Sequence, residues 1–305
     1  MFPHVFQGDL FEQLGNYPSA LQQHARVLSV YERELPSSHP DRIRAMGTKA
    51  CALRLLCRLD ESLALFKAAL KLGRRVFVED SDSLIVLEEN MAHTLDHLGD
   101  SGAAAEVYER LIVVQERSPL YGPSHEQTWE TRSKLGRTLV ELGNVSAAIP
   151  LLRDALAAYD GMGLGPEHPR LGAIPQQYAI ALLRAGRPAE AVPLLHRSIA
   201  YHECKHGPHN YFIPADLLRL AEAYGQMGRG FGERLSLLDR AVSIRELSVG
   251  RDKDQDAGQR TVVLQACAEC YEEAGHLDEA EERWAKCVAA FEKVRGGRAR
   301  GLVLY

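Results

Sequence analysis

Apolar residues recur every three or four positions over long stretches of this chain, and short polar turns interrupt these stretches at regular intervals. An apolar period near 3.6 residues is typical of an amphipathic α-helix. Each turn links one such helix to another, and Gly or a substitute ends the first helix. The pattern therefore predicts an all-α chain built from helix pairs. The turn positions are Gly15, Cys57, Gly99, Gly143, Gly186, Gly228 and Gly275.

The turns repeat with a nearly constant period, in steps of 42, 42, 44, 43, 42 and 47 residues. Gly suits the end of a helix, because the backbone there commonly adopts a left-handed conformation in which a Cβ atom costs energy. Two units depart from this template. The second has Cys57 in place of Gly, and the sixth carries one extra residue and has Arg234 where a small residue is expected. We therefore expect the second helix of the sixth unit to begin late or to be displaced.

Small residues stand at two fixed distances from most turn positions. Two closely packed antiparallel helices need facing rows of small side chains, so this spacing favours tight pairing within each unit. The row five residues after the turn position contains Ala20, Ala104, Ala148, Ala191 and Ala280. The row seven residues before it contains Gly8, Ala50, Ala92, Gly136, Ala179, Ala221 and Ala268.

Short segments related to Gly-Pro-Asp-His-Pro separate several of the units, at residues 37–41, 122–125, 165–169 and 207–210. With the period and the small-residue rows, they make the chain resemble tetratricopeptide repeats, specifically the longer kind found in kinesin light chains. The resemblance covers nearly the entire chain. It implies a right-handed α-solenoid of about seven repeats, with one array over residues 1–294 and a basic tail over residues 295–305.

The resemblance also implies a binding groove lined by the first helix of each pair. Family members hold an extended peptide there through side chains nine and six residues before the turn Gly. Amide side chains at these positions pair with the backbone of a bound strand whatever its sequence. Carried onto this chain, the implied groove residues are Asn90, His93, Lys134, Arg137, Gln177, Arg219 and Glu222.

Charge refines this expectation. The chain has a formal net charge of −5 and a pI near 6.2, which argues against nucleic acid as a partner. Lys134, Arg137 and Arg219 would nevertheless make the middle of the groove cationic. We therefore expect a protein or peptide partner, with an acidic segment in the groove. The alternative is a structural subunit of a larger assembly, docked through its ends or its convex face.

Targeting signals and cofactor motifs do not appear in the sequence. No apolar run is long enough to span a membrane, and the first fifteen residues lack the pattern of a secretory signal. The six cysteines are irregularly spaced and most lie within helical stretches, which fits a reducing compartment, whether cytosol, nucleus or an organelle matrix. A cytoplasmic location is the default expectation. We expect no cofactor and no membrane association.

Histidine pairs are the strongest signal for an enzyme. His202, Glu203 and His206 form an HExxH motif, which on a helix offers two imidazoles to Zn²⁺ and a Glu as general base. A zinc hydrolase is therefore a less favoured alternative, because the motif falls at the end of a repeat helix. His93 and His97, also four residues apart, are a second weak metal candidate. We expect a non-enzymatic scaffold without a metal site.

Overall fold

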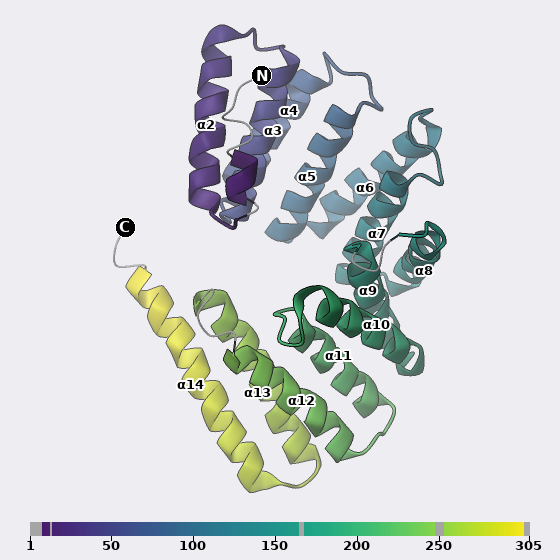
Figure 1. The fold of residues 1–305 in the computed structure, drawn as a ribbon, viewed down its shortest axis with the longest axis vertical. Helices are drawn as coiled ribbons and strands as arrows, with labels where there is room; N and C mark the ends of the chain where they lie inside the picture. The colour runs from purple at the N-terminus through teal and green to yellow at the C-terminus, as the bar shows by residue number, and fades with distance from the viewer. Residues whose placement is uncertain (1–7, 13, 165–167, 248–252, 302–305) are drawn as a thin grey trace. The chain divides into compact units, whose positions relative to one another are not determined.

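The computed structural model describes residues 8–12, 14–164, 168–247 and 253–301, and every regular element in these ranges is a helix. Residues 8–12 are helical and precede α2. The remaining helices (Figure 1) are α2 (Tyr17–Glu34), α3 (Pro40–Leu55), α4 (Leu59–Gly73), α5 (Asp82–Leu98), α6 (Ser101–Arg117), α7 (Glu126–Glu141), α8 (Val145–Gly161), α9 (Arg170–Arg184), α10 (Pro188–His206), α11 (Ile213–Gln226), α12 (Phe231–Leu247), α13 (Lys253–Glu273) and α14 (Leu277–Gly301).

The chain divides into two compact units, residues 1–151 and 152–305, and α8 crosses the boundary between them. From α2 to α7 in the first unit, and from α9 to α14 in the second, each helix packs against the helix that follows it in the chain. In the first unit α3 also contacts α5, and in the second α11 contacts both α9 and α13. First helices of successive repeats are therefore neighbours, as expected for a stack of helix pairs.

The turns have the backbone conformation that the sequence predicts. The six glycines at the turn positions have φ between 67° and 83°, in the left-handed region. Cys57 also adopts this conformation, with φ of 58°, and is the one non-Gly residue with positive φ in the described part of the chain. A side chain at such a position costs energy, so the second turn keeps its geometry at the expense of local strain.

The small-residue rows lie at the helix contacts within the pairs. Ala20, Ala104 and Ala191 are fully buried, as are most of their counterparts on the first helices. In the second repeat Ser62 takes the place of Ala, and its hydroxyl donates to the backbone carbonyl of Ala50 at 2.8 Å. A small polar residue is accepted there because its hydrogen bond is satisfied inside the pair.

Large apolar side chains fill the space between successive pairs. In the first unit Phe66 and Ile43 are fully buried, and Leu70 and Leu84 nearly so, in one cluster that joins α2, α3, α4 and α5. Each helix pair leaves an apolar face that only its neighbour covers. Stacking of repeats is therefore what stabilises each unit.

Two histidines of the inter-repeat segments, His39 and His125, cap helices. His39 precedes α3 and accepts the backbone N–H of Asp41 through Nδ1 at 3.2 Å. His125 does the same for Gln127 at the start of α7, at 3.1 Å. Each imidazole satisfies one of the N–H groups that the first turn of a helix leaves without a partner. These histidines therefore have a structural explanation.

The sixth pair departs from the others as expected. Helix α12 begins at Phe231, three residues after the turn glycine Gly228, whereas the other second helices begin two residues after theirs. Arg234 then lies against Gly225 of α11, where an added Cβ would stand 3.2 Å from the guanidinium carbon. The last helix, α14, continues to Gly301 and so includes residues 295–301 of the predicted basic tail.

Candidate functional site

Three residues of the first unit that stand nine or six positions before a turn residue line one cavity. Thr48 and Cys51 of α3 and Asn90 of α5 surround a hollow of about 290 Å³, which we call the α3–α5 pocket. Its wall is largely apolar and includes Leu87, which occupies the space that a side chain on Gly47 would need. Its polar groups come from Arg44, Thr48, Asp82, Ser83 and Asn90.

Asn90 is half-buried at the edge of this pocket, where its amide has local partners. Its Nδ2 donates to the carbonyl of Val86 at 2.9 Å, and its Oδ1 accepts weakly from Arg54 at 3.5 Å. The long contact to Arg54 leaves acceptor capacity on the amide oxygen. Asn90 therefore retains the chemistry needed to pair with a backbone N–H.

Lys134 of α7 is paired with carboxylates. Its ammonium lies 3.4 Å from Glu89 of α5 and 2.9 Å from Glu130. Glu89 is buried, and its carboxylate also accepts from the hydroxyl of Thr131 at 2.8 Å and from the amide of Gln127 at 3.0 Å. Lys134 therefore helps to neutralise an acid that connects α5 with α7.

Arg137 is engaged in the same way one turn further along α7. Its guanidinium donates to Asp96 of α5 at 2.5 Å, and the hydroxyl of Thr138 donates to the same carboxylate at 3.0 Å. The Asp96 side chain is only 5% exposed. A carboxylate this deeply buried needs a charged or hydrogen-bonding partner, and Arg137 supplies it.

These pairs correct the expected charge of the groove. The sequence predicts a cationic stretch at Lys134, Arg137 and Arg219, but each of these side chains forms an ion pair with a carboxylate. Glu89 and Asp96 lie on the preceding repeat, 45 and 41 residues away in the chain. The positive charges of Lys134, Arg137 and Arg219 are therefore balanced by neighbouring carboxylates, so they give little support to the expected preference for an acidic segment.

His93 and His97 lie together on α5, with ring centroids 4.8 Å apart. Burial, with a smaller contribution from Arg54 and then from His97, lowers the pKa of His93 to about 3. Burial and the charges of Arg54 and Arg137 also lower the pKa of His97. Both imidazoles are therefore neutral at physiological pH. The carboxylates of the same helix, Glu89 and Asp96, bind side chains of α7.

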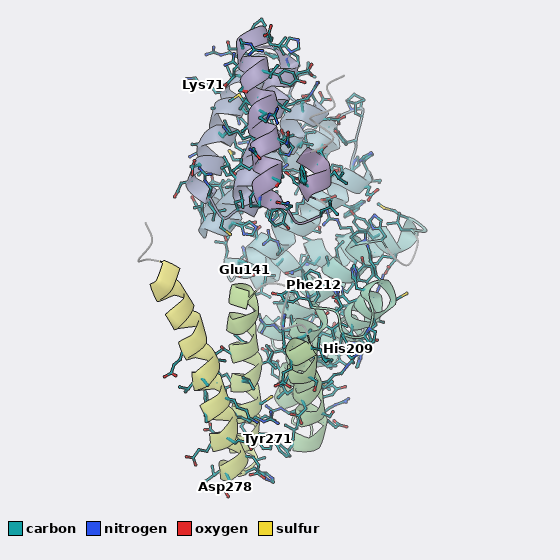
Figure 2. The ribbon with its side chains drawn as sticks, turned by 60° about the vertical axis from the view of Figure 1, so that its left-hand side comes forward. Lys71, Glu141, His209, Phe212, Tyr271 and Asp278 are labelled. Carbon is teal, nitrogen blue, oxygen red and sulfur yellow. The ribbon has the colours of Figure 1, made fainter. Side chains whose placement is uncertain are left out.

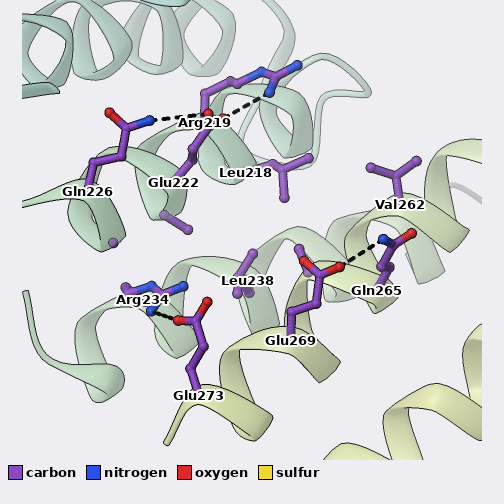
Figure 3. Close-up of a pocket in the computed structure, with 13 residues that line it drawn as sticks. Leu218, Arg219, Glu222, Gln226, Arg234, Leu238, Val262, Gln265, Glu269 and Glu273 are labelled. Carbon is purple, nitrogen blue, oxygen red and sulfur yellow. Dashed lines mark hydrogen bonds and ion pairs between the residues drawn. The ribbon is translucent and has the colours of Figure 1, made fainter. Parts of the chain in front are cut away.

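A second cavity, of about 470 Å³, lies within the second unit between α11 and α13, and we call it the α11–α13 pocket (Figure 3). Its lining includes four positions at the groove spacing: Arg219, Glu222, Ala266 and Glu269. The structure thus brings the corresponding residues of repeats six and seven to one hollow, as it does for repeats two and three. Gln177 lies half-buried on α9 and does not line this pocket.

Polar side chains around the α11–α13 pocket form short-range pairs. Arg219 donates to Glu222 at 2.9 Å, and Arg234 forms an ion pair with Glu273 (Figure 3). Glu269 accepts from the amide of Gln265 at 2.8 Å. The lining therefore combines two ion pairs, one carboxylate–amide hydrogen bond and several apolar side chains.

Asp216 of α11 is a fully buried carboxylate that the motif search did not single out. It accepts from Gln176 of α9 at 2.6 Å and from Ser198 of α10 at 2.7 Å. Burial raises its pKa to about 6, although both hydrogen bonds act in the opposite direction. Asp216 thus links the fifth and sixth repeats through neutral donors.

The HExxH motif is not arranged as a zinc site. His202 stacks against Phe212 with centroids 5.2 Å apart, whereas Glu203 forms an ion pair with Arg240 of α12. Phe212 projects from the segment between α10 and α11 (Figure 2). The rings of His202 and His206 lie 6.2 Å apart. Among the described residues, no group of three or more His, Cys, Asp or Glu side chains is placed to hold a metal ion.

The cysteines of α13 belong to the core. Cys267 and Cys270 are almost completely buried, and burial raises the pKa of both thiols, that of Cys267 to about 12. Protonated, buried thiols are poor metal ligands and poor nucleophiles. In the part of the chain described here, no helix has the length and apolar character needed to cross a membrane.

Sequence patterns did not reveal the acids that connect neighbouring repeats. Glu89, Asp96 and Asp216 lie on first helices, and each has a partner 40 to 42 residues further along or back in the chain. A signal does exist, because each acid is separated from one partner by close to one repeat period. Only a search for charge and hydrogen-bond partners one period apart would have found it.

The fold and its surfaces define the class of protein: an array of helix pairs whose first helices carry polar side chains around shallow pockets. Sequence profiles described as Tetratricopeptide repeat match residues 4–75 and 177–197. No curated protein matches the chain in sequence.

Solved structures show the same fold at low sequence identity. The nearly identical TPR-like repeats of a kinesin-light-chain-type protein from Podosopora anserina are 22% identical, with a TM-score of 0.58 over 69% of this chain and 97% of that one. BtubC (BKLC) from P. vanneervenii is 16% identical, with a TM-score of 0.64 over 78% of this chain and 92% of that one. A Rap protein complexed with competence and sporulation factor is 13% identical, with a TM-score of 0.64 over 96% of this chain and 75% of that one. The profile matches thus mark tetratricopeptide repeats at residues 4–75 and 177–197, and the solved structures show that the chain shares their all-α repeat fold.

Proposed function

We propose that this chain is a non-enzymatic scaffold that binds a partner protein through an extended segment laid across the first helices of the repeats. The observation that carries the proposal is the position of the two pockets. Each lies between first helices of consecutive repeats, and each is lined by residues at the groove spacing: Thr48, Cys51 and Asn90 in the first unit, and Arg219, Glu222, Ala266 and Glu269 in the second.

The chemistry of the α3–α5 pocket suits one residue of such a segment. Its apolar wall, with Val86 and Leu87, accommodates an aliphatic or aromatic side chain, and the amide of Asn90 at its edge can pair with the backbone of the segment. Burial of apolar surface supplies affinity, whereas the amide fixes direction and register. A Rap protein with a similar fold has been solved in complex with competence and sporulation factor, which supports a binding role for a scaffold of this fold.

Site-specific cross-linking of selected peptides tests this proposal. Random nonapeptides displayed on phage are selected on the full chain, and the enriched peptides are synthesised with biotin. A photoreactive benzoylphenylalanine is placed at Thr48 or at Gln265, which line the two pockets. Matched controls carry it at Lys67 of α4 or Ser236 of α12, which are exposed on second helices.

We expect the peptide to cross-link at Thr48 or Gln265, and excess unlabelled peptide to suppress that product. Cross-linking at Lys67 or Ser236 alone would contradict the groove. It would favour the alternative of a subunit docked through its second helices. Enrichment of no peptide that cross-links at Thr48 or Gln265 would also reject the proposal.

A further inference from the structure

The α11–α13 pocket is lined by small residues and by larger apolar residues that form its walls. The small residues are Ala221 and Gly225 of α11 and Ala266 of α13, and the walls include Leu218, Leu238 and Val262, which Figure 3 labels. Arg234, at which the sixth repeat departs from the template, lies against Gly225, and both residues line the pocket. The irregular repeat therefore contributes to this lining.

The charges around the pocket leave one carboxylate without a cation. Arg219 pairs with Glu222, and Arg234 pairs with Glu273. Among the described residues that line the pocket, Glu269 is the acid whose only partner is a neutral amide, that of Gln265. The three carboxylates and two guanidinium groups of this described lining give it a formal charge of −1.

We propose that the α11–α13 pocket receives a lysine or arginine side chain of the bound segment, with the cationic head at Glu269. This inference rests on the proposed function, because it assumes a segment lying across the first helices. The aliphatic stem of such a side chain packs along Leu218, Leu238 and Val262, and its head reaches the polar rim.

Other side chains fit this lining less well. An acidic side chain would face Glu222, Glu269 and Glu273, so repulsion would oppose its entry. A purely apolar side chain would bury the walls but would desolvate Glu269 without giving it a new partner. Of these side chains, only a lysine or arginine both packs its stem against the apolar walls and gives Glu269 a cationic partner. This preference is opposite to the one that Lys134, Arg137 and Arg219 suggest from sequence.

A double-mutant cycle between peptide and protein tests the assignment. Peptides that cross-link at Gln265 are resynthesised with each lysine replaced by norleucine, or each arginine by citrulline, and their dissociation constants are measured by fluorescence anisotropy. The protein variant is Glu269→Gln. The matched control is Glu281→Gln, an exposed glutamate of α14 outside the pocket.

At one peptide position, we expect removal of the cation and Glu269→Gln each to weaken binding about 3- to 5-fold, as for a solvent-accessible ion pair. Together they should weaken it no more than either alone, because both remove the same contact. Glu281→Gln should leave every dissociation constant unchanged. Circular dichroism should show that both variants remain folded.

Two results separate failure of this inference from failure of the proposed function. If peptides cross-link at Gln265 but no cationic residue is coupled to Glu269, the assignment of the pocket is wrong and the groove stands. If no peptide cross-links at Thr48 or Gln265, the groove itself is wrong, and the inference falls with it.

Discussion

The two units bury a carboxylate on a first helix in different ways. Asp96 in α5 is held by the guanidinium of Arg137 and the hydroxyl of Thr138, both from the next repeat. Asp216 in α11 is fully buried with neutral donors only, and burial raises its pKa to about 6. A buried acid can therefore join neighbouring repeats in two ways. Its charge is neutralised by a cation, as at Asp96, or its burial favours the protonated form, as at Asp216.

This contrast gives the units opposite responses to acid. In the first unit burial lowers the pKa of His93 to about 3, so acidification favours the unfolded state, which binds the proton more readily. In the second unit the raised pKa of Asp216 means that the folded state takes up the proton first. Between pH 7 and pH 5 the first unit should lose stability from His93, while the second should gain it from Asp216.

Removing the cation from the first unit should have the largest effect. We expect Arg137→Met to lower the free energy of unfolding by about 2–4 kcal/mol, because it leaves Asp96 buried without a charge partner. Urea unfolding, followed by hydrogen exchange and mass spectrometry of each unit, measures the change. The exposed pair of Arg240 and Glu203 offers a control, since Arg240→Met should cost less than about 1 kcal/mol.

The double variant Asp96→Asn with Arg137→Met distinguishes a charge effect from loss of packing. Without the buried charge, most of the lost stability should return. Equal destabilisation of the single and double variants would show that Arg137 acts mainly through the contacts of its side-chain stem.

Removing the acid from the second unit should have a smaller effect with a defined pH dependence. The stability that wild-type Asp216 contributes is fully present below its unfolded pKa of 3.8 and is lost as pH rises through about 6. The free energy of unfolding of the Asp216→Asn variant should therefore exceed that of wild type by about 2 kcal/mol at pH 7.5 and by much less at pH 4.5. Urea unfolding at both pH values measures the difference. A gain independent of pH would contradict a buried, titrating carboxylate.

His93 should give the stability of the first unit the opposite dependence on pH. Because its folded pKa is depressed, the destabilisation appears as pH falls below the unfolded value of 6.5. At pH 5 we expect it to reach about 1–2 kcal/mol, and His93→Gln should remove that pH-dependent part. Hydrogen exchange of α5 and its neighbours at pH 5 and pH 7 reports the change. His196→Gln on α10 provides the matched substitution in the second unit, and protection of α5 should remain pH-dependent in that variant.

The smallest expected effect concerns the turns. Cys57→Gly places glycine where φ is 58°, and it should stabilise the first unit by about 0.5–1 kcal/mol, because the strain of a left-handed side chain exceeds the added freedom of the unfolded chain. Thermal unfolding measures it. The reverse change, Gly186→Cys in the second unit, should cost a similar amount. A destabilised Cys57→Gly variant would mean that the thiol makes a contribution of its own.

Much of the fold follows from local pattern. Gly99 and Gly143 have the left-handed φ that their position at a helix end predicts, and Ala104 is buried as its distance from the turn predicts. The late start of α12 is also confirmed. The electrostatic character of the groove did not follow, because Lys134 and Arg137 look free until the preceding repeat is placed beside them.

The sequence by itself determined the repeat, its turns and the helix face that each small residue occupies, since helical periodicity and left-handed turns act over a few neighbouring residues. Only the tertiary structure decided which charges meet and where a hollow remains. Glu89 reaches Lys134 across 45 residues of chain, and Glu269 is left beside a pocket because Arg234 pairs elsewhere. Such outcomes depend on how the side chains of neighbouring repeats pack against one another, and local sequence pattern does not encode that packing.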